Sequence, residues 1–128
     1  MAITPLGHAT DSLGVGERTL RGAVRASSRK PIEVIAPSVE TQLWPAWAMT
    51  AVEAARLAPS GGNSQPWRFR LGDGSLVMSG IESAYWTAQM DYGIAMLHAE
   101  LGALKASVTG AWTTGLDVPD VARFTPAG

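Results

Sequence analysis

A short run of glycines and small polar residues, held between Pro59 and Pro66, constrains the fold more than any other feature of the chain. Before it lies the alanine-rich run AWAMTAVEAARLA, which strongly favours helix and stops at Pro59. After it, Trp67, Phe69 and Leu71 alternate with charged or polar positions, which predicts a half-buried strand with these three side chains inward. Together with the hairpin and the second helix described below, this order predicts a mixed α+β arrangement.

Turn residues and hydrophobic spacing predict the remaining elements of this part of the chain. Gly72, Asp73 and Gly74 are typical of a turn, so residues 67–79 should form a β-hairpin. A second, longer helix should follow, because apolar residues recur there at spacings of three and four. They are Ile94, Leu97, Leu101, Leu104 and Val108. The tail, residues 109–128, has room for one short strand before it frays.

The N-terminal third is less regular. Residues 3–16 predict an irregular entry segment, because Pro5, Gly7, Gly14 and Gly16 stand among few apolar side chains. Residues 16–30 predict a helix with a basic stripe, for which a solvated face is the simplest interpretation. The stripe consists of Arg18, Arg21, Arg25 and Arg29. Pro31 should end this helix, residues 32–35 should be extended, and Pro37 should open a linker.

Composition excludes several classes of function. A chain of 128 residues has the size of one domain, and its net charge of −1 offers no field for nucleic acid or an anionic membrane. Without cysteine it has no disulfide, thiolate nucleophile or cysteine-bound metal, which fits a reducing compartment. Two distant histidines do not define a metal site, and no apolar run reaches membrane-spanning length. We therefore expect a soluble, cytoplasmic protein with no metal site.

The loop after Pro59 carries the chemistry that remains, since no nucleophile, acid and base set is recognisable. Its glycines let backbone N–H groups approach a flat ligand closely. Ser60, Asn63 and Gln65 can bond the edge of a heteroaromatic ring, which would suit an isoalloxazine. Composition alone favours a simpler alternative, an ordinary connection in which Ser60 and Asn63 bond their own backbone and Trp67 is core.

Three motifs resemble one family. The run APSGGNSQPWRF, residues 58–69, resembles the Ala-Pro-Ser-x-x-Asn-x-Gln-Pro-Trp signature of the nitroreductase family of FMN-dependent oxidoreductases. The run MDYGIAMLHAELGA, residues 90–103, is similar to the family's Asp-x-Gly-Ile-Ala helix, which packs at the core and the dimer interface. Residues 28–31, SRKP, resemble the family's Arg-Lys-Pro segment. Because Arg-Lys-Pro comes first and no Arg-Arg-Ser-x-Arg segment precedes the loop, the chain resembles the second half of a branch with two fused half-domains.

The resemblance implies a fold and a set of site residues. The fold would be a nitroreductase-like half-domain, with helices packed on a small antiparallel β-sheet. Residues 1–43 would form an arm and linker, and residues 44–128 the core. Arg29 would hold the FMN phosphate, with Lys30 as a second candidate, because a guanidinium donates in a planar fork. The residues lining the flavin would be Pro59, Ser60, Gly61, Asn63 and Gln65.

The implied activity is transfer of reducing equivalents from NAD(P)H through FMN to a nitroaromatic or quinone acceptor, with no catalytic side chain. The chain would pair with itself or with a missing N-terminal half. The alternative is an inactive module that binds or sequesters flavin, or a truncated structural module; an interaction domain without ligand is a third hypothesis. Asp91 is interpreted as a helix-start residue and His98 as a packed histidine. Core or interface positions are expected for Trp44, Trp47, Trp86 and Trp112.

Overall fold

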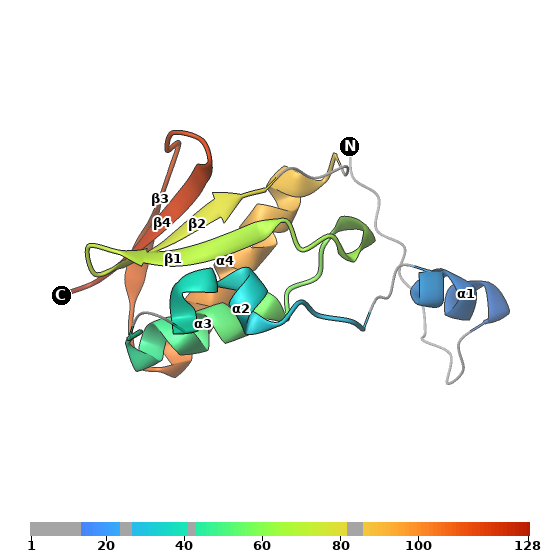
Figure 1. The fold of residues 1–128 in the computed structure, drawn as a ribbon, viewed down its shortest axis with the longest axis horizontal. Helices are drawn as coiled ribbons and strands as arrows, with labels where there is room; N and C mark the ends of the chain where they lie inside the picture. The colour runs from blue at the N-terminus through green and yellow to red at the C-terminus, as the bar shows by residue number, and fades with distance from the viewer. Residues whose placement is uncertain (1–13, 24–26, 41–42, 82–85) are drawn as a thin grey trace.

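The structure is a computed structural model that describes residues 14–23, 27–40, 43–81 and 86–128. Its elements follow one another along the chain as helices, short 3-10 turns and strands (Figure 1). The helices are α1 (Val15–Ala23), α2 (Ile32–Ile35), α3 (Ala46–Arg56) and α4 (Ala88–Lys105), and the 3-10 turns are η1 (Pro37–Glu40) and η2 (Gly61–Asn63). The strands are β1 (Trp67–Gly72), β2 (Ser75–Gly80), β3 (Gly110–Thr114) and β4 (Asp120–Pro126).

The strands form one antiparallel sheet in the order β1-β2-β4-β3. The predicted hairpin is confirmed, with Gly72 opposite Ser75. Its two turn residues, Asp73 and Gly74, have φ of 51° and 72°, the left-handed conformation that matches the twist of a two-residue hairpin. The α+β fold and the small antiparallel sheet are therefore as the sequence predicts.

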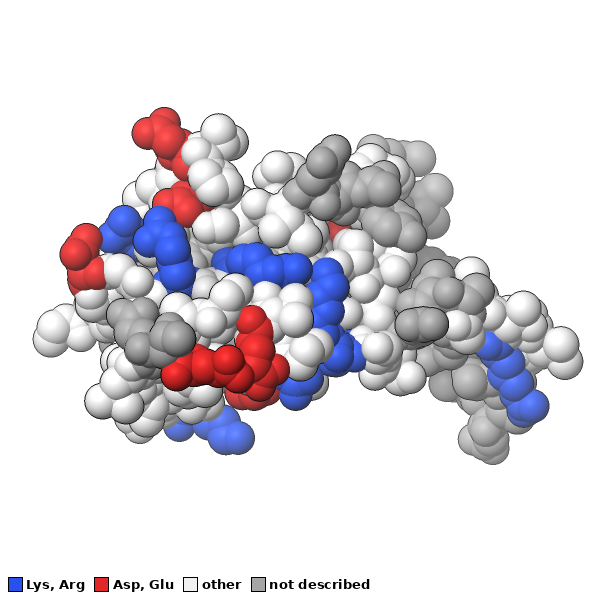
Figure 2. Space-filling view, in the orientation of Figure 1, with Lys and Arg blue, Asp and Glu red and all other residues white. Residues whose placement is uncertain are grey.

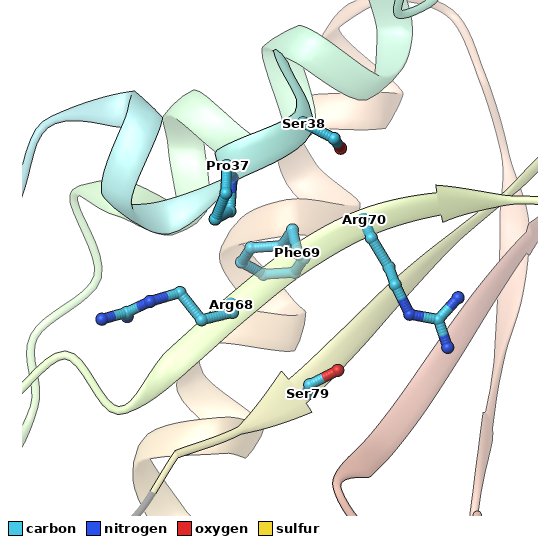
Figure 3. A pocket seen from close by; sticks show the side chains of 6 residues that line it. All are labelled: Pro37, Ser38, Arg68, Phe69, Arg70 and Ser79. Atoms are coloured by element: carbon cyan, nitrogen blue, oxygen red, sulfur yellow. The ribbon is translucent and has the colours of Figure 1, made fainter. Parts of the chain in front are cut away.

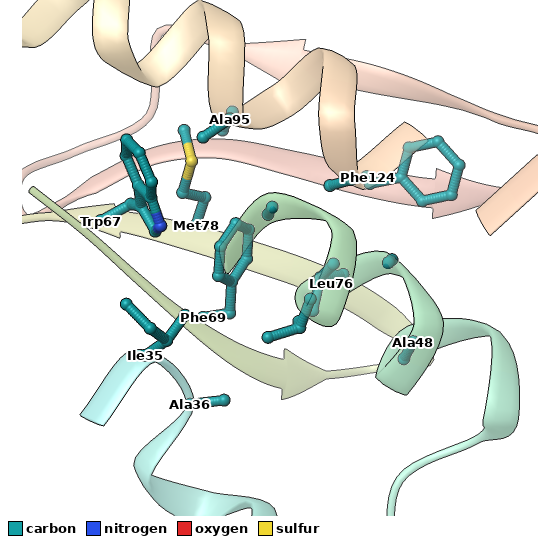
Figure 4. Packing of buried hydrophobic residues seen from close by; sticks show 14 of the residues in the cluster. Ile35, Ala36, Ala48, Trp67, Phe69, Leu76, Met78, Ala95 and Phe124 are labelled. Carbon is teal, nitrogen blue, oxygen red and sulfur yellow. The ribbon is translucent and has the colours of Figure 1, made fainter. Parts of the chain in front are cut away.

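The core lies where α3 and α4 pack together against one face of the sheet (Figures 1 and 4). The helices contribute small side chains, which lets them approach closely, and the strands contribute large ones that fill the space between. The buried helix residues include Ala48, Ala51, Val52, Ala55, Ala95, Ala99 and Ala103, and the buried strand residues include Trp67, Phe69, Leu76, Met78 and Phe124. Leu71 packs partly buried against this cluster, so the predicted inward face of β1 is confirmed.

The expectation of an extended run over residues 32–35 is wrong, because these residues form the helix α2. Pro31 precedes it with φ −63°, and proline has no N–H to lose at a helix start. Ile32 packs against the core and Ile35 is fully buried, a spacing of three that suits one helix face. Tertiary burial thus outweighs the β preference of a branched run.

The tail contains two strands instead of the single one expected. β4 pairs with β2 on one side and with β3 on the other, so the last part of the chain completes the sheet. Phe124 is buried, and its ring lies 5.3 Å from that of Trp112 and 5.9 Å from that of Trp47. The contact with Trp47 joins residues far apart in sequence, which local turn signals do not predict.

The basic stripe does not run along one helix. α1 ends at Ala23, and Arg29 lies beyond it in a segment without regular structure. Arg25 and most of the predicted irregular entry segment, up to residue 13, fall outside the described residues. In Figure 1, α1 stands to one side of the other elements.

The long helix is present, but the predicted apolar stripe is divided: Ile94, and Val108 beyond the helix end, pack against the chain's own core, whereas the three leucines face away from it. Leu97, Leu101 and Leu104 are 56%, 55% and 53% exposed, whereas alanines on the opposite side of α4 are buried. Met90, at the start of the same helix, is 62% exposed. We call the exposed residues Met90, Leu97, Leu101 and Leu104 the α4 stripe.

Candidate functional site

Residues 59–66, which we call the polar loop, connect α3 to β1 through a tight turn. Asn63 N–H donates to the Ser60 carbonyl at 2.9 Å, and Ser64 N–H donates to the Gly61 carbonyl at 3.0 Å. Gly62, Asn63 and Gln65 have φ of 55°, 56° and 46°. Glycine and asparagine tolerate this left-handed conformation better than most residues, so the local sequence suits the turn.

Gln65 organises the loop from inside. Its side chain is buried, and its backbone N–H donates to Ser60 Oγ at 2.8 Å. The Gln65 amide accepts from the Lys30 backbone N–H at 2.8 Å and donates to Asn63 Oδ1 at 3.1 Å. The bonding capacity of this side chain is thus used within the protein, which gives Gln65 a role in shaping the loop.

Residues 28–30 lie alongside the polar loop, more than thirty positions away in the chain. Asn63 Nδ2 donates to the Ser28 carbonyl at 2.9 Å. Arg29 Nη1 reaches Asn63 Oδ1 at 3.4 Å, and its Nε reaches the Leu57 carbonyl at 3.4 Å. The structure therefore brings Arg29 together with the loop residues that the sequence singles out.

Two further cations gather on the same loop. Lys30 Nζ donates to the carbonyls of Ser64 at 2.7 Å and Gln65 at 3.2 Å, and Arg68 Nη1 donates to that of Trp67 at 2.6 Å. Burial lowers the pKa of Lys30, the charge of Arg68 lowers it further, and burial lowers the pKa of Arg68. In the described part of the chain neither forms an ion pair with a carboxylate.

Basic side chains gather near the centre of the face in Figure 2, where residues 28–31 and the start of β1 lie in Figure 1. The cluster of Arg29, Lys30 and Arg68 gives this part of the molecule a positive field, although the whole chain carries a net charge of −1. A positive field with several N–H donors can hold a phosphate or another oxyanion. The sequence did not identify Arg68, because strand alternation explains a charged residue at that position.

Asp91 is the second residue whose place at the site the sequence did not predict. It lies in the first turn of α4 with 3% of its surface exposed, and one carboxylate oxygen accepts from the Gly61 N–H at 3.0 Å. The other oxygen accepts from Thr87 Oγ1 at 3.2 Å. A helix-start role accounts for the aspartate, so its contact with the polar loop, thirty positions away, gave no separate signal in the sequence.

The predicted site residues differ in how much of them a ligand could reach. Pro59 is exposed, whereas Ser60, Gly61, Asn63 and Arg29 are half-buried and Gln65 is buried. Trp67, the end of the signature run, is fully buried in the core, as the simpler interpretation of the loop expected. Ser60 and Asn63 also bond the chain itself, so the loop is ordered by its own contacts.

A separate groove of about 260 Å³ lies at the edge of the sheet, between η1 and β1 (Figure 3). It is lined by Pro37, Ser38, Arg68, Phe69, Arg70 and Ser79. Arg70 forms an ion pair with Asp120 at 2.5 Å, and Ser79 donates to the same carboxylate at 2.8 Å. None of the flavin-lining residues predicted from the sequence lines this groove, so it is distinct from the polar loop.

Among the described residues, no three histidine, aspartate or glutamate side chains gather closely enough to hold a metal ion. Within the same residues, no helix is both long and apolar enough to span a bilayer.

Comparison with known proteins identifies the family. Residues 2–103 match the model of the family described as "Putative TM nitroreductase". The fold is similar to the crystal structure of "a putative nitroreductase" from Thermotoga maritima MSB8, with a TM-score of 0.60 and 27% sequence identity. The similarity covers 76% of this chain and 41% of that one, so this chain spans less than half of the related protein. No curated protein matches. The matched region holds all three motifs and the polar loop, and the chain therefore belongs to this nitroreductase family.

Proposed function

We propose that this chain binds FMN at the polar loop and forms one half of a cytoplasmic, flavin-dependent nitroreductase. One observation carries the proposal: residues 28–30 and the polar loop, far apart in sequence, are held together by side-chain hydrogen bonds. This contact joins a cluster of cations to a set of short polar groups. A flavin mononucleotide needs that combination, since it has a phosphate at one end and a heteroaromatic ring at the other.

The residues present fit such a ligand in chemistry. Arg29 and Lys30 supply charged donors for a phosphate, and Arg68 beside Lys30 adds a third cation. Ser60 and Asn63 are half-buried and carry both donors and acceptors for the edge of a ring. Gly61 would help to shape the site, because its missing side chain lets the loop lie against Thr87. Gln65 would act by keeping the loop in shape, because its amide is bonded within the protein.

When bound, FMN would supply electron transfer from NAD(P)H to a nitroaromatic or quinone acceptor. The chain's own residues would bind and orient the flavin and keep the loop rigid. No side chain of this chain is assigned a proton transfer in that scheme. The similarity to a protein described as a putative nitroreductase supports this class of reaction but specifies neither the electron donor nor the acceptor.

The α4 stripe supports a pairing partner. Three leucines on one helix, each about half exposed, form an apolar surface of the kind that marks contacts between proteins. The related protein is more than twice as long as the region it shares with this chain. A second copy of this chain, or a separate N-terminal half, would cover the stripe and complete the flavin site.

The experiment is to add FMN to the purified chain, desalt it, and record the visible spectrum together with the mass by light scattering. Flavin retained on a dimer supports the proposal, and NADH or NADPH oxidation by the retained flavin then tests the reaction. Flavin absent from a dimer, under conditions that also saturate a known flavoprotein, would refute binding by the paired chain. A monomer without flavin would instead direct the search to a separate N-terminal half.

A matched pair of arginine variants tests the phosphate contact. Arg29→Gln should weaken FMN binding by about tenfold and leave the weaker binding of riboflavin unchanged, because riboflavin lacks the phosphate. Arg18→Gln, at an exposed position on α1, is the control and should change neither. Equal losses for FMN and riboflavin would contradict a phosphate contact.

A second candidate function, a module without catalytic activity, is supported by the hydrogen bonds within the loop. Arg29, Asn63 and Gln65 bond one another and the nearby backbone, so the loop keeps its shape as an ordinary connection. This favours the alternative of an inactive module that binds or sequesters flavin, or of a truncated structural module. Retained FMN that NAD(P)H cannot reduce, even in the dimer, would select the sequestering module. No flavin in any assembly would select the structural one.

A further inference from the structure

Asp91 carries a buried charge whose partners come from two different parts of the fold. Its carboxylate accepts from the Gly61 N–H on the polar loop and from the Thr87 hydroxyl just before α4. Only 3% of the residue is exposed. A carboxylate removed from water is costly unless donors surround it, and here a loop amide provides one of them.

The position of Asp91 in α4 adds to this. It occupies the first turn of the helix, where the positive end of the helix dipole favours a negative charge. The helix thus stabilises the carboxylate, and the carboxylate holds the loop. The loop is fixed from the other side by residues 28–30, so it is clamped between two parts of the chain.

Gly61 is the loop's contact point with α4. A Cβ atom placed on Gly61 would lie 2.1 Å from Thr87 Oγ1 and 3.3 Å from Thr87 Cβ. Such a separation is far below van der Waals contact, so the side-chain hydroxyl of Thr87 would have to move. The loop therefore sits against α4 as closely as a residue without a side chain allows.

We propose that Asp91 is a positioning residue of the ligand-binding loop: through the Gly61 amide it fixes residues 60–63 against α4 in the conformation that receives the ligand. The proposal rests on the proposed function for the identity of that ligand. Its structural part, the dependence of the Gly61 region on Asp91, is measurable without any flavin.

The first test compares Asp91→Ala with Asp91→Asn. We expect amide hydrogen exchange at Gly61 to accelerate at least tenfold in Asp91→Ala, because the hydrogen bond to a charged acceptor is lost. FMN affinity should fall by a similar factor. Asp91→Asn keeps an oxygen acceptor and should recover most of both. Asp120→Ala is the matched control: it also removes a hydrogen-bonded carboxylate, but one that bonds Arg70 and Ser79 on the sheet.

The outcomes separate positioning from a general effect on the fold. Faster exchange confined to residues 60–63, with sheet amides unchanged, supports the proposal. Unchanged Gly61 exchange in Asp91→Ala overturns it, and so does a uniform acceleration over β2 and β4, which would show that Asp91 stabilises the whole fold. If the wild-type chain binds no FMN, the proposed function fails, while Gly61 exchange still decides whether Asp91 positions the loop.

A second set of variants covers the case in which Asp91→Ala does not fold. Gly61→Ala should accelerate exchange in the loop, because its Cβ meets Thr87 Oγ1. In a Thr87→Ala background the same change should have a much smaller effect, since the nearest obstacle is gone. An equal effect of Gly61→Ala in both backgrounds would overturn the proposed seating of the loop on α4.

Discussion

At the scale of single residues, the polar loop is a network of side chains that bond one another. Gln65 joins residues 28–30 to the turn, and Asn63 connects Arg29 to Gln65. The motif in the sequence identified these residues but did not show which of them bond the protein and which are left to bond a ligand. Periodicity and composition describe which side chains can form hydrogen bonds, whereas the choice between a ligand and the protein as partner depends on tertiary burial.

Asn63 offers a residue-scale prediction, because its side chain and its backbone conformation can be tested separately. Asn63→Ala should weaken FMN binding by about tenfold without unfolding the chain, since the side chain lies half-buried on a loop. Alanine also strains a residue with φ 56°, by about 1 kcal/mol. Asn63→Gly removes the amide without that strain. Equal flavin titrations for wild type and Asn63→Gly would exclude the amide from the site.

Lys30 gives a prediction about pH. Burial, and then the charge of Arg68, lowers its pKa from the ordinary 10.5. Between the lowered pKa and 10.5, the unfolded chain therefore binds more protons than the folded chain. The contribution of Lys30 to the free energy of unfolding therefore increases as pH rises through that window. Arg68→Gln should raise the Lys30 pKa.

NMR titration of the side chain measures this shift. The sequence has two lysines, Lys30 and Lys105, so their signals are readily assigned by one substitution. Arg123→Gln, which removes a charge from β4 instead, is the control. A Lys30 pKa unchanged by Arg68→Gln, or changed equally by Arg123→Gln, would contradict a direct effect of Arg68.

At the scale of elements, α4 has two different faces. The sequence predicted a helix here with a leucine stripe, and both are present. Periodicity did not show that alanines and Gly102 make the contact with α3 while the leucines face outward. Hydrophobic spacing cannot distinguish a face that packs on the same chain from one that packs on another. The β1–β2 hairpin was predictable because its signals, alternation and a glycine-containing turn, are local.

Gly102 and Gly93 form a matched pair on this helix. A Cβ on Gly102 would lie 2.5 Å from the Thr50 carbonyl oxygen and 2.7 Å from Ala51 Cα, whereas one on Gly93 would meet nothing within 4 Å. Gly102→Val should therefore lower the free energy of unfolding by about 3 kcal/mol or prevent folding. Gly93→Ala should raise it by up to about 1 kcal/mol through helix propensity. Urea unfolding checks both, and a Gly102→Val loss below that of an ordinary surface change would contradict the close α3–α4 contact.

At the scale of the whole molecule, the sequence predicted the class of fold correctly but underestimated the number of strands in the tail. The last strands, β3 and β4, were underestimated because β4 joins the sheet by pairing with β2, more than forty residues earlier in the chain, and β3 then pairs with β4. Local sequence signals are equally unable to report contacts with another chain. Met90 and the exposed leucines of α4 have a spacing that is typical of a helix face packed in a core, and we propose that a second chain supplies the other side of that core.

Pairing through the α4 stripe therefore gives the last prediction. The wild-type chain should have the mass of a dimer in solution, twice 13.4 kDa, and Leu101→Lys should return it to 13.4 kDa. Each half-exposed leucine contributes about 1 kcal/mol when buried, and a lysine in the middle of the stripe adds the cost of desolvating a charge. Glu40→Lys, at an exposed position in η1, introduces the same side chain away from α4 and should leave the dimer intact.

Flavin retention should weaken in the variant that loses the dimer. Because α4 holds Gly61 through Asp91 and also presents the stripe, loss of the partner should weaken FMN retention in Leu101→Lys, whereas Glu40→Lys should retain FMN as the wild type does. The two readings come from one sample, by light scattering and by the visible spectrum after desalting. A Leu101→Lys monomer that retains flavin as well as the wild type would show that one chain holds the whole site. A wild-type monomer would show that a second copy does not cover the stripe, which leaves a separate half as its partner.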